Sequence, residues 1–232
     1  MPVIVIVGYG PGNGHALAER FGREGWSVAL VGRTASRLED GVARLAASGT
    51  SAHAFVADAS DPAAVRDVVR RVREQLGPVT SVALTAFRSV PVPDVLVAEP
   101  EVVAHVFDIG VTGLLATVQA ALGDLRAAGT GSVLVVNGAL GQHDDAVDAF
   151  LTTVGGDGVA LECAAKTKLV GLLAARLRAD GVYVGEVVIN GSVAGSPYAG
   201  PTAIDPADIA DRLWAMAAER TEVHVHVAEQ RA

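Results

Sequence analysis

Aromatic residues, cysteines and clustered positive charge are all scarce in this sequence. Phenylalanine, tryptophan and tyrosine make up 4% of the 232 residues, whereas half of the residues are hydrophobic. The core must therefore be packed from valine, alanine and leucine, as is typical of buried parallel strands covered by alanine-rich helices. The single cysteine, Cys163, excludes an internal disulfide and fits a reducing compartment.

Basic residues are outnumbered by acidic ones. The chain carries 18 lysines and arginines against 26 aspartates and glutamates, which gives a formal net charge of −8. Its densest basic group, Arg70, Arg71 and Arg73, falls on polar positions of an expected helix, where a solvated face accounts for it. Because nucleic-acid binding needs clustered positive charge, we expect a small-molecule substrate and no nucleic-acid partner.

Long apolar segments are also missing. No uninterrupted apolar run approaches the ~20 residues that a membrane-spanning helix needs. The first residues run straight into the apolar stretch Val3–Val7 without the basic leader of a secretory signal. We therefore expect a cytoplasmic protein that does not enter a membrane.

Short apolar runs alternate with longer segments of helical period. This alternation predicts βαβ units, and thus an α/β fold with a parallel sheet. No linker or repeat interrupts the series, so we expect one domain over residues 1–232. The expected strands are Val3–Val7, Ser27–Val31, Ala52–Val56, Ser81–Ala86, Ser132–Asn137, Tyr183–Ile189 and Val223–Val227. The expected helices are Gly14–Glu24, Ser36–Ala47, Ala63–Gln75, Glu101–Leu125, Val159–Ala179 and Pro206–Ala218.

Local signals mark some element ends and two long connections. Asp61-Pro62 and Asp205-Pro206 each place a capping acid before a proline suited to the first helical turn. The stretches Gly141–Gly158 and Gly191–Asp205 are rich in glycine and small residues and follow expected strands. Open α/β sheets bind ligands at the carboxyl ends of their strands. We expect both stretches to be functional loops, with disorder as the alternative.

A glycine-rich turn follows the first expected strand. The segment Gly8-Tyr9-Gly10-Pro11-Gly12-Asn13-Gly14 leads directly into helical sequence, and its first, fifth and last residues fit the spacing G-x-x-x-G-x-G. Glycines let the backbone approach a pyrophosphate closely, and the helix N-terminus offers free N–H groups to its charge. We predict a dinucleotide site here, including Tyr9 and Asn13; a tight structural turn is the alternative.

The end of the second expected strand bears on the choice of cofactor. It reads Val31-Gly32-Arg33-Thr34, and no carboxylate follows until Glu39. An acid at this position binds the ribose 2′-hydroxyl of NAD, whereas an arginine meets the 2′-phosphate of NADP. Arg33 and Thr34 therefore favour NADP(H) over NAD(H), unless Arg33 is only a solvated loop residue.

With these residues in place, the chain resembles the short-chain dehydrogenase/reductase family over nearly its whole length. The spacing of Gly8, Gly12 and Gly14 is similar to the fingerprint of that family. The resemblance implies a Rossmann-type doubly wound sheet of about seven parallel strands with helices on both faces. It also implies NAD(P)-dependent carbonyl or alcohol chemistry. The further cofactor-binding residues that it implies are Asp58, Thr85, Ala86, Lys166, Asn190 and Gly191.

The resemblance weakens at the catalytic centre. The family uses an Asn, a Ser and a Tyr-x-x-x-Lys pair, and the matching positions here are Gly110, Gly138, Glu162 and Lys166. The charge of Lys166 favours an ionised Glu162, which accepts a proton but cannot donate one. Burial would raise the pKa of Glu162 and restore its capacity to donate. An ordinary ion pair between residues four apart on a helix is the alternative.

Other residues are weaker candidates for chemistry. Tyr198 lies after the sixth expected strand, and His143 with Asp144 follows the fifth, where a base and its partner could reach a substrate. His224 and His226 share one face of the last strand, but no further ligand stands at metal-binding spacing, so we expect no metal site.

Three functions remain open from the sequence. The first is an atypical NADP(H)-dependent oxidoreductase in which Glu162 and Lys166 replace the usual acid/base pair. The second is a non-redox isomerase, lyase or cyclase, and the third is a nucleotide-binding protein without catalysis. The family resemblance also implies a homodimer or homotetramer, for which the small residues of Val159–Ala179 suit close helix packing.

Overall fold

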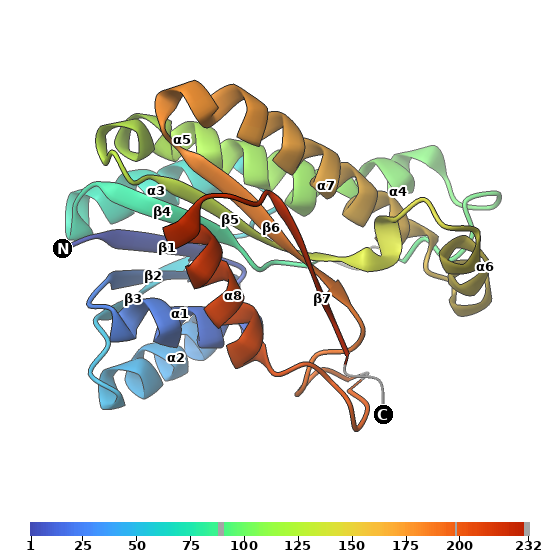
Figure 1. Cartoon of the computed structure of the whole chain (residues 1–232), viewed down its shortest axis with the longest axis horizontal. Coiled ribbons are helices and arrows are strands. Elements are labelled where there is room, and N and C mark those ends of the chain that lie inside the picture. The colour runs from blue at the N-terminus through green and yellow to red at the C-terminus, as the bar shows by residue number, and fades with distance from the viewer. Residues whose placement is uncertain (88–90, 198, 230–232) are drawn as a thin grey trace.

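A seven-stranded parallel sheet forms the centre of the protein (Figure 1). The computed structural model describes residues 1–87, 91–197 and 199–229. The strand order is β3-β2-β1-β4-β5-β6-β7, and every neighbouring pair is parallel. The strands are β1 (Val3–Val7), β2 (Ser27–Gly32), β3 (Ala52–Val56), β4 (Val79–Leu84), β5 (Ser132–Gly138), β6 (Tyr183–Asn190) and β7 (His224–Ala228). This sheet confirms the expected Rossmann-type doubly wound fold.

Helices cover both faces of the sheet. Helices α1, α2 and α8 lie on one face, and α3, α5 and α7 lie on the other (Figure 1). The helices are α1 (Asn13–Arg23), α2 (Ala35–Ala47), α3 (Pro62–Leu76), α4 (Pro100–Ala104), α5 (Leu114–Ala127), α6 (Asp145–Val154), α7 (Asp157–Leu177) and α8 (Pro206–Glu219). Two of the expected caps are confirmed, because Asp61 accepts hydrogen bonds from the first turn of α3 and Asp205 from that of α8.

The two faces of the sheet carry two apolar cores. Along β1, Val3, Val5 and Val7 belong to one core, and Ile4 and Ile6 belong to the other. Successive side chains of a strand point to opposite faces, so a strand covered on both sides must be apolar throughout. The unbroken apolar run of β1 is therefore a consequence of helices on both faces.

An aromatic cluster packs at the amino ends of the strands, away from their carboxyl ends. Phe21 of α1 meets Trp26 and Trp214 edge to face, with ring centroids 5.0 and 4.9 Å apart. Arg20 stacks over Trp214, with its guanidinium carbon 4.6 Å from the ring centroid. Both tryptophans of the chain therefore take part in the contact between α1 and α8.

The helix expected over Glu101–Leu125 is divided into three parts. Helix α4 is followed by a π-helical turn over Asp108–Gly113 and then by α5. A side chain at Gly113 would place its Cβ 2.1 Å from the carbonyl oxygen of Ala59, so this turn needs glycine for close packing. Such π turns are frequent at functional sites. The stretch Pro100–Ala127 is apolar and long enough to cross a membrane, a property shared by core helices, and α5 packs against α3 and β4.

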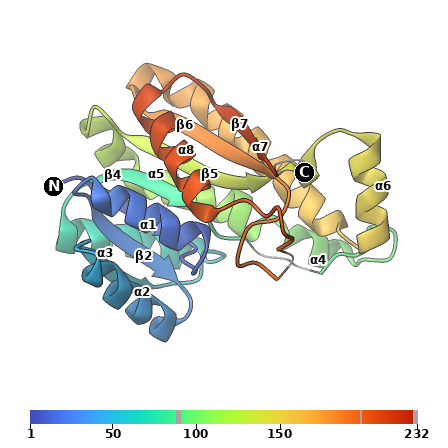
Figure 2. The ribbon, with the colours of Figure 1, turned by 60° about the horizontal axis from the view of Figure 1, so that its bottom comes forward.

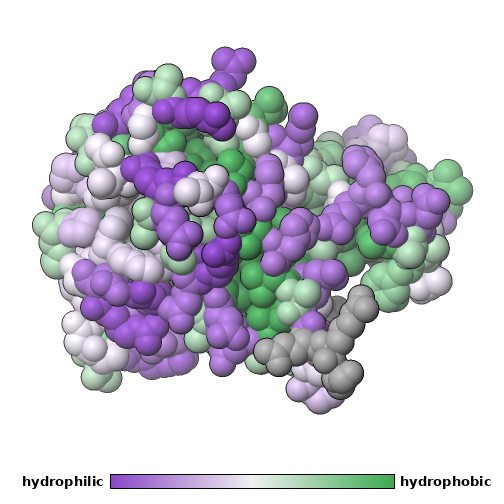
Figure 3. All heavy atoms as spheres, viewed as in Figure 1, coloured by the Kyte–Doolittle hydropathy of each residue, from purple (hydrophilic) through white to green (hydrophobic). Residues whose placement is uncertain are grey.

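The expectation of a loop over Gly141–Gly158 is wrong, because this stretch contains helix α6. Asp144 begins the helix by accepting hydrogen bonds from Ala146 N and Val147 N, and Gly155 ends it at a φ of +66°. Figure 2 shows α6 standing beyond the sheet next to α4. In Figure 3, hydrophobic and hydrophilic side chains are mixed at this end of the molecule, and Phe150 and Val154 of α6 are exposed.

Candidate nucleotide site and catalytic centre

The turn after β1 is held between the two strands that flank it. Gly8 N and Tyr9 N both donate to the carbonyl of Val31 in β2, each at 2.9 Å. On the other side, the Oγ1 of Thr85 donates to the carbonyl of Gly8 at 3.0 Å. Gly8 has a φ of +96°, and a Cβ there would lie 2.2 Å from Ala86 N. Only glycine fits this position without moving the backbone.

Beyond Gly8 the turn opens toward solvent. No atom lies within 4 Å of a Cβ built on Gly10 or Gly12. Gly12 precedes α1, and no side chain caps the helix there. Asn13 is the first residue of the helix, and its buried Oδ1 has no hydrogen-bond partner among the residues that the structure describes. The uncapped amides of the first turn and the space above them suit an anionic group such as a diphosphate.

Tyr9 packs against the second helix. Its ring lies so close to α2 that a Cβ on Gly41 would be 2.3 Å from the phenol oxygen. The phenol is hydrogen-bonded to Nδ1 of His15 at 2.8 Å. Burial raises the pKa of Tyr9 and lowers the pKa of His15, so both side chains are neutral near pH 7. The pair links the turn to α1 and α2.

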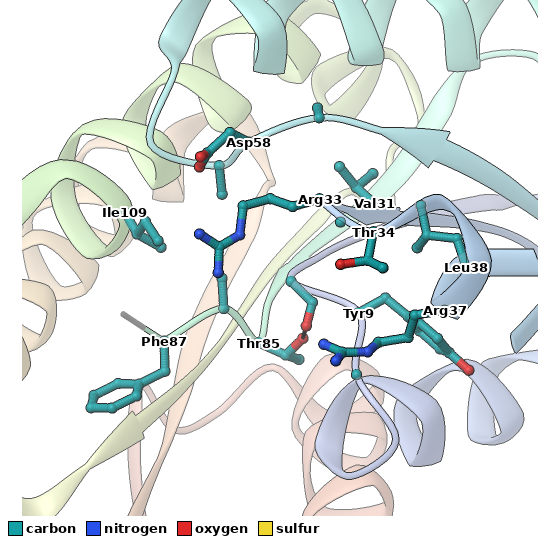
Figure 4. Close-up of a pocket in the computed structure, with 16 residues that line it drawn as sticks. Tyr9, Val31, Arg33, Thr34, Arg37, Leu38, Asp58, Thr85, Phe87 and Ile109 are labelled. Atoms are coloured by element: carbon teal, nitrogen blue, oxygen red, sulfur yellow. Dashed lines mark hydrogen bonds between the residues drawn. The ribbon is translucent and has the colours of Figure 1, made fainter. Parts of the chain in front are cut away.

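A cleft of about 290 Å³ runs along the carboxyl ends of the strands beside this turn (Figure 4). Arg33 reaches across it from the end of β2, and Arg37 lies next to Tyr9 (Figure 4). Both arginines are exposed. The cleft brings together the predicted cofactor residues Gly8, Tyr9, Arg33, Thr34, Asp58, Thr85 and Ala86.

Several lining residues had not been predicted as part of this site. Arg37, Leu38, Phe87 and Ile109 also line the cleft. The position of Arg37 one helical turn after Arg33 was the signal available in the sequence, whereas Ile109 comes from the π-helical turn far along the chain. Asp58, on the cleft wall, accepts hydrogen bonds from the N and Oγ of Ser60 at 2.9 and 2.7 Å.

Glu162 and Lys166 lie one turn apart on α7 and form a buried pair. The Nζ of Lys166 is 3.8 Å from Oε1 of Glu162, and the two side chains are 1% and 0% exposed. At 3.8 Å the ammonium is beyond hydrogen-bonding distance, and no other described residue donates a hydrogen bond to either carboxyl oxygen of Glu162. Burial raises the pKa of Glu162, and the charge of Lys166 opposes that rise. Lys166 lies toward the cleft, with its Nζ 6.0 Å from the centroid of the Phe87 ring.

Glycine occupies two positions, 110 and 138, at which the family has catalytic side chains. Gly110 faces the Glu162–Lys166 pair, and Gly138 faces Cys163 next to it. A Cβ on Gly110 would lie 2.7 Å from Oε1 of Glu162, and one on Gly138 would lie 3.4 Å from Sγ of Cys163. Burial raises the pKa of Cys163, so its thiol is neutral. Glu162 and Cys163 therefore pack close to the places where side chains at 110 and 138 would begin.

Behind the pair lies a polar network that the sequence analysis did not predict. The Nδ2 of Asn137 lies 3.0 Å from the carbonyl of Cys163, 2.9 Å from the Thr167 hydroxyl and 3.0 Å from Oε2 of Glu186. The other oxygen of Glu186 is bonded to Nδ1 of His224 at 2.7 Å. This network ties the end of β5 to α7, β6 and β7, and so fixes the helix that carries Lys166.

Asn190 ends β6 and Gly191 follows it, and both are in contact with Glu229 near the C-terminus. Glu229 N donates to the carbonyl of Asn190, and a Cβ on Gly191 would be 2.4 Å from Cγ of Glu229. The Glu229 carboxylate accepts from the Ser192 hydroxyl at 2.6 Å and from the Thr202 hydroxyl at 3.0 Å. These bonds lower the pKa of Glu229.

The remaining candidates are scattered. Asp144 is the N-cap of α6, and His143 beside it is exposed. Tyr198 lies outside the described residues. Gln142 Nε2 is bonded to His226 at 3.1 Å, while His224 belongs to the network of Glu186. Over residues 1–87, 91–197 and 199–229, no three His, Cys, Asp or Glu side chains lie together as a metal site would require.

Comparisons with known proteins agree with this geometry. A family model described as short chain dehydrogenase matches residues 2–149. The protein named as ketoacyl reductase 2 of the granaticin polyketide synthase of Streptomyces violaceoruber is 32% identical over 144 residues. That alignment covers 61% of this chain and 57% of the relative, so the chain spans just over half of its length.

Two further similarities extend over most of the chain. The 1-deoxy-11-beta-hydroxypentalenate dehydrogenase of Streptomyces exfoliatus is 27% identical over 219 residues, covering 90% of this chain and 77% of the relative. An NADPH-bound short chain oxidoreductase of Pseudomonas aeruginosa PAO1, described as containing an atypical catalytic center, superposes with a TM-score of 0.85. It is 20% identical, and the superposition covers 100% of this chain and 98% of that one. At this identity the structural likeness establishes the fold alone.

Proposed function

The chain belongs to the short-chain dehydrogenase/reductase family, and we propose that it is an NADP(H)-dependent oxidoreductase acting on a small carbonyl or alcohol substrate. The observation that carries this proposal is the cleft that joins the Gly8 turn to Arg33 and Arg37. Its walls combine the conformation of a phosphate-binding turn with two cations at the end of β2. After β2, no carboxylate follows in the sequence until Glu39 that could repel a 2′-phosphate.

The residues present fit a nicotinamide dinucleotide. The open space over Gly10 and Gly12 and the uncapped first turn of α1 suit its diphosphate. Arg33 would pair with the 2′-phosphate through the two-pronged geometry of its guanidinium. Asp58 would hold the adenine, and Asn190 and Gly191 would flank the nicotinamide. When bound, this group supplies or accepts a hydride.

The chain itself must handle the proton. Hydride addition to a carbonyl leaves negative charge on the substrate oxygen, which a proton then neutralises. We assign this proton to the Glu162–Lys166 pair, which stands where the family has its Tyr and Lys. Within the pair, the ammonium of Lys166 would give the proton, and the Glu162 carboxylate, whose ionised form the charge of Lys166 favours against the effect of burial, would hold that ammonium in place.

Replacing Arg33 tests the assignment of the cofactor. We expect the unmodified protein to bind NADPH about tenfold or more tightly than NADH, because the guanidinium pairs with the 2′-phosphate. Arg33→Ala should remove most of that preference and leave NADH binding unchanged. Calorimetric titration with both dinucleotides measures this, and Arg178→Ala, an exposed arginine after α7, is the control. Equal affinities in the unmodified protein would contradict the role of Arg33.

Turnover distinguishes redox chemistry from its alternatives. A panel of small carbonyls and alcohols, followed by nicotinamide absorbance, should show oxidation of NADPH or reduction of NADP⁺. The glycines at 110 and 138 leave two family positions without a functional side chain. If the dinucleotide binds and its absorbance never changes with any substrate, a non-redox enzyme or a nucleotide-binding protein replaces the proposal.

We also propose a cytoplasmic location and a homodimeric or homotetrameric state.

A further inference from the structure

Position 110 and position 162 are related by steric fit. Gly110 lies in the π-helical turn that faces α7. A Cβ there would be 2.7 Å from Oε1 and 3.0 Å from Cγ of Glu162, and 3.2 Å from Cε of Lys166. All three distances are shorter than ordinary van der Waals contact between side chains. The Glu162 carboxyl therefore has room at this position because residue 110 has no side chain.

The carboxyl in this recess is fully enclosed. Glu162 is 0% exposed, and within the described part of the chain both its oxygens are buried without a hydrogen bond. Burying a carboxyl without donors is costly, so a chain that keeps one there draws on it for something other than packing. Glu162 does not line the cleft, whereas its neighbour Lys166 lies beside Phe87 of the cleft wall, so Glu162 can act on a bound molecule through Lys166.

Lys166 is the neighbour through which it can act. Its ammonium is 3.8 Å from the carboxyl and lies on the side of Phe87, which lines the cleft. Lys166 is the charged group that acts on the pKa of Glu162. The other titratable groups nearby are the neutral thiol of Cys163 on the same helix and, beyond it, Glu186 on β6, which is paired with His224. Among the described residues, the cation that faces the carboxyl is Lys166.

We propose that Gly110 and Glu162 form a matched pair, in which the bare backbone at 110 creates the recess for the carboxyl and Glu162 positions Lys166 for the dinucleotide. The second half of this inference rests on the proposed function. In this proposal Glu162 is a positioning residue, and Gly110 is the residue that leaves room for its carboxyl. The two departures from the family pattern are then one coupled change.

Binding of NADPH by four variants tests the positioning role. Glu162→Gln keeps the shape and removes the charge, and Gly110→Ala pushes the flexible end of Glu162 away from Lys166. We expect each to weaken NADPH binding about tenfold, with no further loss in the Gly110→Ala/Glu162→Gln double variant. Glu162→Asp, which keeps the charge, should recover part of the loss. Gly123→Ala is the control, since a Cβ on that helix glycine meets nothing within 4 Å.

Two binding results would overturn the proposal. If Glu162→Gln binds NADPH like the unmodified protein, the carboxyl has no role in positioning Lys166. If the losses in the double variant multiply, positions 110 and 162 act independently. A pH series adds a readout that packing alone would not move. The 2′-phosphate of NADPH gains its second charge at about pH 6, so the affinity of Glu162→Gln should also rise with pH. The affinity of the unmodified protein should rise more steeply, because Glu162 ionises as well.

A thermal stability cycle without dinucleotide tests the matched pair by itself. Gly110→Ala should lower the Tm when Glu162 is present and lower it much less in a Glu162→Ala background. An equal lowering in both backgrounds would refute the steric pairing. If the unmodified protein binds no dinucleotide, the proposed function fails, and this cycle still decides whether Gly110 makes room for Glu162.

Discussion

At the scale of single residues, Gly8 is constrained both in its backbone conformation and by its neighbours. Its φ of +96° lies in the region that favours glycine, and its backbone is hydrogen-bonded to Val31 of β2 and to Thr85, the residue after β4. Both constraints act on the same residue, so a side chain there meets strain and collision together. The neighbouring Gly10 has neither constraint, because its Cβ would point into open space.

This contrast leads to a matched pair of substitutions. Gly8→Ala should lower the free energy of unfolding by more than about 2 kcal/mol, since the strained φ and the contact with Ala86 both add cost. Gly10→Ala should change it by less than about 0.5 kcal/mol. Urea denaturation of both variants measures the difference. Equal stability of the two would show that the turn relaxes around a Cβ at position 8.

At the scale of elements, the segment between β6 and α8 is held in place by hydrogen bonds to Glu229, the residue after β7. Glu229 accepts hydrogen bonds from Ser192 and Thr202, which lie near the two ends of this segment, and Val193 bridges to Ile204. In the proposed function, this segment flanks the nicotinamide. Glu229 therefore acts as a clasp that shapes the segment before any ligand arrives.

The clasp should depend on pH. The hydrogen bonds lower the pKa of Glu229 below that of an unfolded chain, so their contribution is present above the ordinary carboxyl range and is lost as the pH falls through the lowered value. Glu229→Gln should speed amide exchange in residues 191–205 at neutral pH, and acidification should do the same in the unmodified protein. Hydrogen exchange read by mass spectrometry checks this, with Glu219→Gln as the control. Unchanged exchange in Glu229→Gln would exclude the clasp.

Local sequence patterns were sufficient to predict most of the helices and strands, but not all of them. The five inner strands could be predicted because a strand buried on both faces must be apolar, and the partly exposed edge strands β3 and β7 because short apolar runs alternate with helical segments. Helices α3 and α8 could be predicted because an acid and a proline mark their starts. Helix α6 was missed because glycines surround it, although Asp144 was a usable capping signal. The π-helical turn was missed because the contact of Gly113 with Ala59 joins segments far apart in the sequence.

The candidate site divides in the same way. The nucleotide cleft could be predicted because its turn and Arg33 follow single strands, and the doubly wound fold brings those strand ends together. The burial of Glu162 could not, because it depends on a recess made by Gly110 in another helix. The Asn137–Glu186–His224 network was missed for the same reason, since its members come from three strands.

At the scale of the whole molecule, the family's homo-oligomeric state remains a proposal with a visible candidate surface. Leu172 of α7 is 51% exposed, and Leu169 and Leu173 beside it are only partly buried. Light scattering at micromolar concentration should give two or four times the mass of one chain, and Leu172→Glu should shift it toward one. Leu96→Glu, at a residue that is 90% exposed elsewhere, should not. A monomeric unmodified protein would end this proposal.

The position of the two tryptophans gives the molecule an internal reporter. Trp26 and Trp214 pack together where α1 meets α8, at the opposite end of the strands from the Gly8 turn. Their emission spectrum therefore follows the integrity of the fold and not the local environment of the cleft. A substitution at Arg33, Gly110 or Glu162 that leaves this intrinsic fluorescence unchanged has acted locally, without any added label.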